Sequence, residues 1–297
     1  MAAPGRRRGL RVGALLAAPI GWLGVVYLGS LAVLLVASFW TLDDFSGLVV
    51  RGFSLDNFQT ILQEPVYRTI VLRTVAIAAL VTLTDILLAL PIAFTMVFLV
   101  GRRTRAILAV AILLPLWASY LVKVYAWKLI LAKEGILTWA TEMTHTGWLL
   151  NAALNLPGIG GNSLSTSFIG TFLTFTYVWL PFMILPMQAA LERVPTSMLE
   201  ASADLGATAR QTFRTVVLPL AMPGIVAGSI FTFSLTLGDY IIPQIIGTSA
   251  SFIGMAVYQL QGTAGNIPLA AAFAVVPIVI MLVYLALAKR AGAFDAL

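Results

Sequence analysis

Six apolar runs constrain this chain more than any other feature of its sequence. Five of them contain no Asp, Glu, Lys or Arg, and the second contains only Asp85. Each can supply the roughly 20 residues that a helix needs to cross a bilayer, provided that the third extends past Lys123 and Lys128 and the fifth past Asp239. The runs cover residues 12–39, 74–100, 106–120, 167–190, 221–237 and 269–288.

Composition excludes an ordinary soluble domain. Of the 297 residues, 60% are hydrophobic and 10% are charged, whereas about a quarter of the residues in a soluble domain are charged. No stretch between the runs is long enough to bury a core of its own. We therefore expect an all-α polytopic membrane protein with six transmembrane helices, in which residues 12–288 form a single domain.

The basic residues predict the orientation of the helices. The net charge of +6 would suit a nucleic-acid partner, but the bases cluster in four short segments beside the apolar runs. With six crossings all four segments fall on one side, which the positive-inside rule makes cytoplasmic. We expect a basic N-terminal segment (1–11) and a C-terminal tail (289–297) in the cytoplasm, lipid around the helices, and no nucleic acid. The bases are Arg6, Arg7, Arg8 and Arg11; Arg102, Arg103 and Arg105; Arg193, Arg210 and Arg214; and Lys289 and Arg290.

The N-terminal bases also allow a second interpretation. Three arginines, Arg6 to Arg8, before an apolar run are typical of a secretory signal and faintly of a twin-arginine signal. The run 12–39 is, however, much longer than the roughly 7–15 residues of a signal h-region. We favour an uncleaved first span.

Several kinds of chemistry are excluded or disfavoured. The chain has no cysteine, so thiol catalysis, disulfides and cysteine metal sites are ruled out. Its only histidine, His145, stands in a loop without clustered ligands, so we predict a surface residue and no metal site. The sequence also lacks a phosphate-cradling Walker A loop, so we expect no ATP hydrolysis by this chain and no bound cofactor.

The segment between the fourth and fifth runs, residues 193–219, predicts two short helices joined at a corner. Ser197 followed by Glu200 matches a capping box, and residues 208–211 match a second one through Thr208 and Gln211. Gly206 suits the left-handed position that ends the first helix. We expect Pro219 to break whatever follows the second helix.

Two carboxylates in the first of these helices share a face. Glu200 and Asp204 are four residues apart. Two like charges at that spacing destabilise a helix by a few tenths of a kcal/mol unless a cation on a partner neutralises them. The pattern therefore favours a docking surface. The alternative is a merely solvated loop in which Glu200 serves as a cap.

The order of residues in this segment resembles the EAA signature of binding-protein-dependent ABC importers. The match runs from Glu200, Ala201 and Ser202 through Gly206 to Val216 and the pair Leu218-Pro219. The resemblance implies a type I importer permease fold, with the segment as a coupling helix in a groove of an ATP-hydrolysing subunit. It implies a charged contact for Glu200, close packing for Ala201 and the corner for Gly206, while Ser202 departs from the usual alanine. The candidate coupling residues are Glu200, Ala201, Ser202, Asp204, Gly206 and Pro219.

Further segments resemble the permeases of spermidine and putrescine importers, which implies a polyamine substrate and a bacterial inner membrane. Ferric iron or an amino acid derivative stays open as a substrate, because specificity in such systems rests largely on a binding protein. The segments are residues 54–58, 114–117, 123–127, 180–186 and 237–243.

The resemblance also implies the partners. We expect a second permease chain, two ATP-binding subunits that hydrolyse ATP with Mg²⁺ and dock on the 193–219 segment, and an external binding protein. An ion-gradient-driven transporter is the rival from another class, although such proteins usually show more intramembrane charge. A membrane scaffold is a third interpretation, but it has no need of the ordered signature.

Two intramembrane carboxylates are candidates for the substrate pathway. A carboxylate at mid-span costs roughly 2.5–3.5 kcal/mol, so Asp85 is expected to face a partner or a wet cavity. It would serve either as a substrate contact or in a hydrogen bond to a neighbouring threonine, such as Thr82 or Thr84 on an adjacent subunit's surface. Asp239, beside Tyr240, is the stronger candidate. Polyamines are polycations that suit carboxylates and aromatic faces, although the same aromatics also suit a core or an interface belt. The aromatic candidates are Trp117, Tyr120, Tyr125 and Trp127.

Overall fold

The computed structural model describes residues 15–43, 45–248 and 252–290. The chain divides into two compact units, each of which is treated by itself: unit 1 comprises Met1–Glu64 and Val257–Val276, and unit 2 comprises Pro65–Ala256 and Pro277–Leu297. The basic segment 1–11 lies outside the described residues, as do residues 291–297 of the tail. The single membrane domain over 12–288 stays a prediction.

The helices confirm the polytopic all-α fold. Among the described residues, five helices are long and apolar enough to cross a membrane, and a sixth span results if one bent pair counts as a single span. The spans are Leu15–Ala37, Pro65–Leu99, Phe168–Leu191, Ala209–Gly238 and Ile267–Arg290, and the bent pair is Arg102–Trp117 with Tyr120–Ile130.

Unit 1 contains a short hairpin after the first span. Strands β1 (Thr41–Leu42) and β2 (Val49–Val50) pair antiparallel, with Thr41 opposite Val50. Helix α3 (Asp56–Gln63) follows, and the side-chain amide of Asn57 donates to the carbonyl oxygens of Ser38 and Trp40. The first span itself is formed by a helix that includes a π-turn η1 (Gly24–Leu28) and α2 (Gly29–Ala37).

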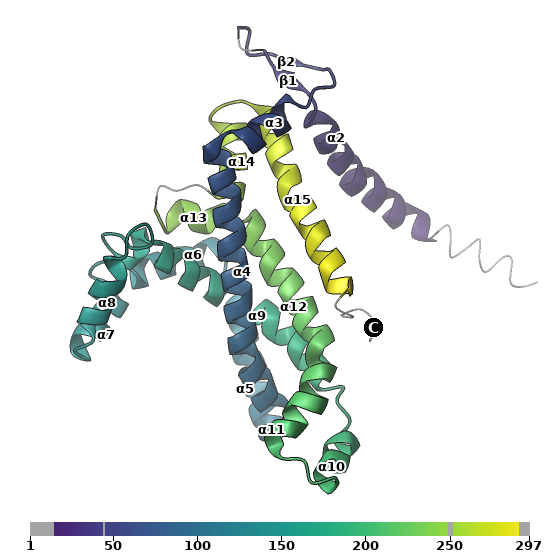
Figure 1. Ribbon diagram of the computed structural model, residues 1–297, viewed down its shortest axis with the longest axis vertical. Helices are drawn as coiled ribbons and strands as arrows, with labels where there is room; N and C mark the ends of the chain where they lie inside the picture. Colours follow the sequence, from purple (N-terminus) through teal and green to yellow (C-terminus); the bar gives the residue numbers. More distant parts are fainter. Residues whose placement is uncertain (1–14, 44, 249–251, 291–297) are drawn as a thin grey trace, which may run out of the picture. The chain divides into compact units, whose positions relative to one another are not determined.

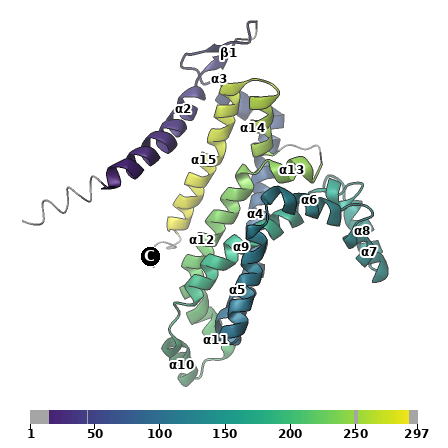
Figure 2. The same ribbon diagram turned by 180° about the vertical axis from the view of Figure 1, so that it is seen from behind.

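Unit 2 is built around three helices that lie side by side, α4 (Pro65–Phe94), α9 (Phe168–Leu191) and α12 (Leu218–Gly238) (Figures 1 and 2). The hydroxyl of Ser167 accepts the amide of Gly170 at 3.0 Å, which explains where α9 begins. The other elements are η2 (Thr95–Leu99), α5 (Arg102–Trp117), α6 (Tyr120–Ile130), α7 (Ile136–Met143), α8 (Gly147–Leu154), η3 (Leu164–Thr166), α10 (Thr196–Asp204), α11 (Ala209–Thr212), η4 (Phe213–Val217) and α13 (Ile241–Ile245); α14 (Ile253–Gly262) and α15 (Ile267–Arg290) hold residues of both units.

The third span is a bent pair of helices. Helix α5 ends at Trp117, and α6 begins at Tyr120 after a bend of 97°. Ala118 and Ser119 both have extended backbone, with ψ of 143° and 137°, and Ser119 stands at the N-cap of α6. The bent pair, counted as one span, extends past Lys123 and Lys128 as expected, but these two residues lie on a helix that runs in a different direction from α5. In Figures 1 and 2, α6, α7 and α8 project away from the three-helix bundle.

The fifth span also ends earlier than predicted. Helix α12 stops at Gly238, and Asp239 is extended with ψ of 132°. Glycine is a weak helix former, and an aspartate carboxylate competes for nearby backbone amides. Here Asp239 Oδ1 accepts the amide of Ile242 at 2.9 Å, which starts the short helix α13 instead of prolonging α12.

Two glycines of α12 allow a close contact between helices. A Cβ atom on Gly224 would lie 2.6 Å from the carbonyl oxygen of Pro186, and one on Gly228 would lie 3.1 Å from the Cα of Met183. Lipid tails are as apolar as leucine, so helices in a membrane associate largely by van der Waals packing, which close backbone approach favours. Small residues at these positions hold α12 against α9.

We expect Gly224→Ala to destabilise the protein by about 1–3 kcal/mol, the usual cost of overpacking, because the new methyl group meets backbone atoms of α9 that cannot turn aside. Gly238→Ala is the matched control on the same helix, since a Cβ there meets nothing within 4 Å. Thermal unfolding in detergent compares the two. Equal midpoints for both variants would contradict the packing role of Gly224.

Candidate functional site

The helix α10 ends in a hydrogen-bonded turn at the corner that the sequence predicted. Gly206 has φ of +77°, in the left-handed region where a side chain is disfavoured. Its amide donates to the carbonyl oxygen of Ala203 at 2.9 Å, and the amide of Ala207 donates to that of Ser202 at 3.1 Å. These two bonds form a Schellman motif. The predicted conformation of Gly206 is confirmed.

One of the two predicted capping boxes exists. The amide of Thr208 donates to Gln211 Oε1 at 2.7 Å, and the amide of Gln211 donates to Thr208 Oγ1 at 3.4 Å. The box between Ser197 and Glu200 is wrong. The N-cap of α10 is Pro195, which is extended and has no side-chain acceptor, so Ser197 falls inside the first helical turn.

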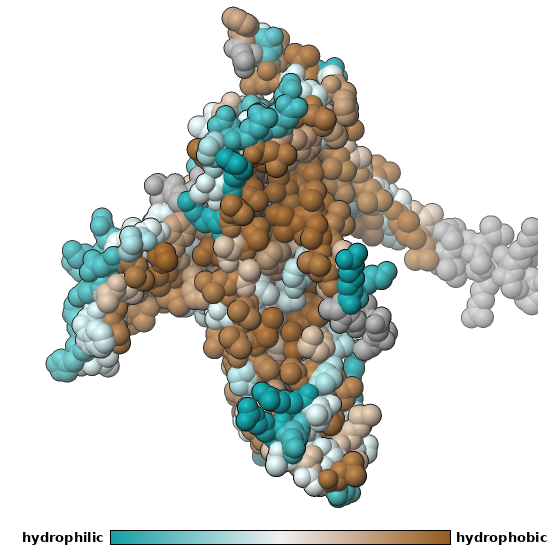
Figure 3. All heavy atoms as spheres, viewed as in Figure 1, coloured by the Kyte–Doolittle hydropathy of each residue, from teal (hydrophilic) through white to brown (hydrophobic). Residues whose placement is uncertain are grey.

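Helix α10 has an anchored face and an open face. Leu199 packs against the apolar cluster where α9 meets the start of α12, and the hydroxyls of Ser202 and Thr212 lie 2.9 Å apart. Ser202, the departure from the usual alanine, thus ties α10 to α11. The open face carries exposed Glu200 and Asp204. In Figure 3 hydrophilic side chains gather over this end of unit 2.

Large apolar residues are also open on α10. Met198 is 49% exposed and Leu205 is 88% exposed. Ala201 lies exposed between them and leaves room for a close approach. This mixture of apolar side chains and carboxylates is what an interface with a partner requires.

The expectation that Pro219 breaks a helix is wrong. Residues Ala209–Gly238 form one helix of 30 residues, in which the π-turn η4 immediately precedes α12. Pro219 stands in the first turn of α12. Its missing N–H removes one backbone bond, and the wider π-turn accommodates the loss without ending the helix. The segment 193–219 is therefore continuous with the fifth span.

A second cluster forms where α6 meets the end of α12. The hydroxyl of Tyr120 donates to Asp239 Oδ2, so the fold joins two predicted residues that are 119 positions apart. The ring of Tyr120 stacks on Trp179 of α9, with centroids 5.8 Å apart and planes 19° apart. The Nζ of Lys123 lies 6.0 Å from the centroid of the Tyr120 ring. We call Tyr120, Lys123, Trp179 and Asp239 the Asp239 cluster.

The remaining predicted aromatics are divided between core and surface. Trp127 packs against Tyr177, with centroids 5.0 Å apart. Tyr240, next to Asp239, is 37% exposed. Trp117 is 91% exposed and Tyr125 is 53% exposed, so both lie outside the cluster and suit a surface belt.

Asp85 is buried in α4 without a partner. Its side chain is 0% exposed, and neither carboxylate oxygen has a hydrogen-bond partner among the described residues. Thr82 of the same chain is not its partner, because that hydroxyl donates to the carbonyl oxygen of Ala78 at 2.7 Å, and the bond to a threonine of an adjacent subunit stays a prediction. The unpartnered indole N–H of Trp179 in the Asp239 cluster is a further buried polar group that the sequence did not predict.

The apolar spans, the open helix α10 between two spans and the half-buried carboxylate–aromatic cluster are the features of a polytopic membrane protein. The chain belongs to the family described as binding-protein-dependent transport system inner membrane component, which matches residues 71–292. It is accordingly an inner-membrane permease of an ABC importer, a transport subunit and not an enzyme.

Similar proteins include permeases named for different cargoes. The inner membrane ABC transporter permease protein YdcU of Escherichia coli is 54% identical over 289 residues, covering 97% of this chain and 92% of that protein. The spermidine/putrescine transport system permease protein PotB of Escherichia coli is 29% identical over 245 residues, covering 82% and 83%. The molybdenum transport system permease protein ModB of Mycobacterium bovis is 28% identical over 213 residues, covering 72% and 70%.

Solved structures confirm the fold. A bacterial ABC transporter that imports the acidic polysaccharide alginate matches with a TM-score of 0.69 and 17% identity, over 96% of each chain. The same kind of transporter in complex with an alginate pentasaccharide-bound periplasmic protein matches with a TM-score of 0.70 and 16% identity, again over 96% of each chain. At this identity the likeness concerns the fold alone.

Proposed function

We propose that this permease carries a polyamine, spermidine or putrescine, and that the Asp239 cluster contacts it during passage. The observation that carries the proposal is the pair of Asp239 and Tyr120 stacked on Trp179. Similarity to the PotB permeases supports the substrate class. Asp85 is left out of this site because it is fully buried.

The cluster suits an ammonium group. Asp239 Oδ2 accepts the hydroxyl of Tyr120 and Oδ1 accepts the amide of Ile242, and a carboxylate has about four lone-pair sites to offer. The aromatic faces add cation–π attraction. Lys123 lies over the same ring that a substrate ammonium would use, so its flexible stem must swing aside when substrate arrives.

The 193–219 segment is the proposed point of coupling to ATP hydrolysis. We propose that α10 docks in a groove of an ATP-binding subunit through Glu200, Asp204 and Ala201. Two such subunits hydrolyse ATP with Mg²⁺, and a second permease, a homologue or a copy, completes the pathway. An external binding protein delivers the substrate, and both termini lie on the cytoplasmic side together with α10.

One continuous helix connects the two sites. Ser202 ties α10 to α11, and the helix that begins there runs without interruption over the 30 residues Ala209–Gly238, a length of about 45 Å. Asp239 follows directly. Movement of α10 on an ATPase would therefore be transmitted to the Asp239 carboxylate through this one helix.

The test is stimulation of ATP hydrolysis in the reconstituted complex by a panel of ligands, each presented with the external binding protein of the system. We expect spermidine or putrescine to stimulate hydrolysis at least several-fold. Stimulation by ferric iron or an amino acid derivative alone would overturn the polyamine proposal. Uptake that continues without any ATPase would favour an ion-gradient mechanism and overturn the proposed drive as well.

A further inference from the structure

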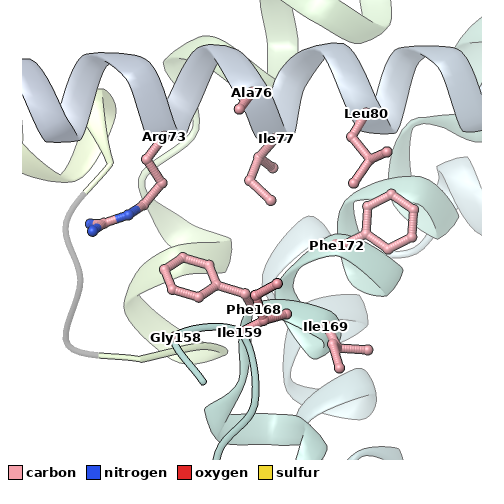
Figure 4. Close-up of a pocket in the computed structure, with 9 residues that line it drawn as sticks. All are labelled: Arg73, Ala76, Ile77, Leu80, Gly158, Ile159, Phe168, Ile169 and Phe172. Carbon is pink, nitrogen blue, oxygen red and sulfur yellow. The ribbon is translucent and has the colours of Figure 1, made fainter. Parts of the chain in front are cut away.

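A cavity on the flank of unit 2 has no part in the coupling or transport described above. It has a volume of about 330 Å³ and lies between α4, the start of α9 and the loop at residues 158–159. Figure 4 shows Arg73 at one end of the cavity and Leu80 with Phe172 at the other. Ala76, Ile159 and Phe168 line the space between them.

The length of α4 places this cavity at a defined depth. The span Pro65–Leu99 has 35 residues, about 52 Å at 1.5 Å per residue, whereas hydrocarbon is about 30 Å thick. A centred helix therefore extends about 11 Å beyond the hydrocarbon at each end. Arg73 lies about 12 Å along the helix from Pro65, at the boundary between headgroups and hydrocarbon, and Leu80 lies about 10 Å deeper, among acyl chains.

The lining matches that change of depth. Arg73 is the one charged residue among those that line the cavity, and the others are apolar or glycine. Its guanidinium carbon lies 5.3 Å from the centroid of the Phe168 ring, which braces it at the end of the cavity. A guanidinium offers five N–H donors in a planar fork that suits phosphate oxygens.

We propose that the cavity binds an anionic phospholipid, with the phosphate at Arg73 and one acyl chain along Ala76, Leu80 and Phe172. Two features select this occupant. Arg73 lies at the edge of the hydrocarbon, where its long side chain can reach the lipid phosphates, and the apolar walls continue from it into the hydrocarbon. The inference does not depend on which solute the permease carries.

Native mass spectrometry of the purified transporter with equal amounts of phosphatidylglycerol and phosphatidylethanolamine tests the site. We expect wild type to retain phosphatidylglycerol and Arg73→Gln to lose about tenfold in retention. Arg68→Gln is the matched control, because Arg68 is an exposed arginine of the same helix that does not line the cavity. Ala76→Trp, which fills the cavity, should lower retention of both lipids.

Equal retention by wild type and Arg73→Gln would overturn the proposal, and so would equal losses in the Arg73 and Arg68 variants. The second permease is the competing occupant. Because the chain has no cysteine, a single Leu80→Cys variant allows a clean crosslinking test in assembled transporter. We expect reaction with a thiol probe carried on a lipid chain, whereas crosslinking to the second permease instead would show that a protein side chain fills the cavity. Arg73→Lys, which keeps the charge, should retain more phosphatidylglycerol than Arg73→Gln if both fold equally well.

Discussion

Replacing Glu200 by lysine is expected to abolish co-purification of the permease with its ATPase subunits and, with it, ATP-driven uptake. Glu200 is exposed on the open face of α10. Removing one partner of a hydrogen-bonded charge pair in an interface costs about 2–5 kcal/mol, and reversing the charge adds repulsion. The affinity should therefore fall by a factor on the order of 10³. Affinity purification from membranes, followed by uptake in proteoliposomes, measures both effects.

The substitution is unlike most interface changes in that it should not weaken the helix itself. Lysine at position 200 stands four residues before Asp204, so it replaces a like-charge pair with an attractive one. Glu192→Lys is the matched control, since Glu192 is an exposed glutamate at the end of α9 outside α10. Ala201→Leu adds bulk at the close-packing position while keeping helix propensity. Normal association of both α10 variants would show that α10 is not the docking surface.

Local signals in the 193–219 segment were the most reliable predictions from the sequence. The left-handed Gly206 and the Thr208–Gln211 box depend on residues within one or two turns of each other, so the sequence alone can specify them. The Ser197 box failed because the helix start depends on the backbone of Pro195, which moves the N-cap by two residues. Continuation of the helix through Pro219 depends on a π-turn that the composition of the segment does not predict.

Hydropathy found the spans but not their direction. Hydropathy measures apolarity alone, and Ala118 and Ser119 are both compatible with a span. It therefore gives no indication of the 97° bend between α5 and α6. Charge and aromatic type singled out Asp239 and Tyr120 separately, and tertiary packing brought them together. Trp179 was missed because a tryptophan inside an uncharged run has no feature that distinguishes a site from a core.

Replacing Asp239 by asparagine is expected to lower spermidine uptake on the order of 10²-fold, mainly by raising KM. The variant removes the negative charge that attracts an ammonium group in a partly desolvated cluster, where loss of a hydrogen-bonded charge contact costs about 2–5 kcal/mol. Asparagine Oδ1 can still accept the amide of Ile242 and so preserve the start of α13. Uptake of labelled spermidine over a range of concentrations separates KM from the maximal rate.

Two further variants distinguish substrate recognition from mere packing at this cluster. Tyr120→Phe keeps the ring stacked on Trp179 but removes the hydroxyl that donates to Asp239, so a smaller loss of about tenfold is expected. Asp56→Asn changes an exposed carboxylate of α3 in unit 1 and should leave uptake unchanged. If Asp239→Asn transports spermidine with an unaltered KM, or if Asp56→Asn is impaired to the same degree, the carboxylate of Asp239 does not bind the substrate. A fall in the maximal rate alone, with an unchanged KM, would instead show that Asp239 takes part in the movement of the 30-residue helix Ala209–Gly238 and does not bind the substrate.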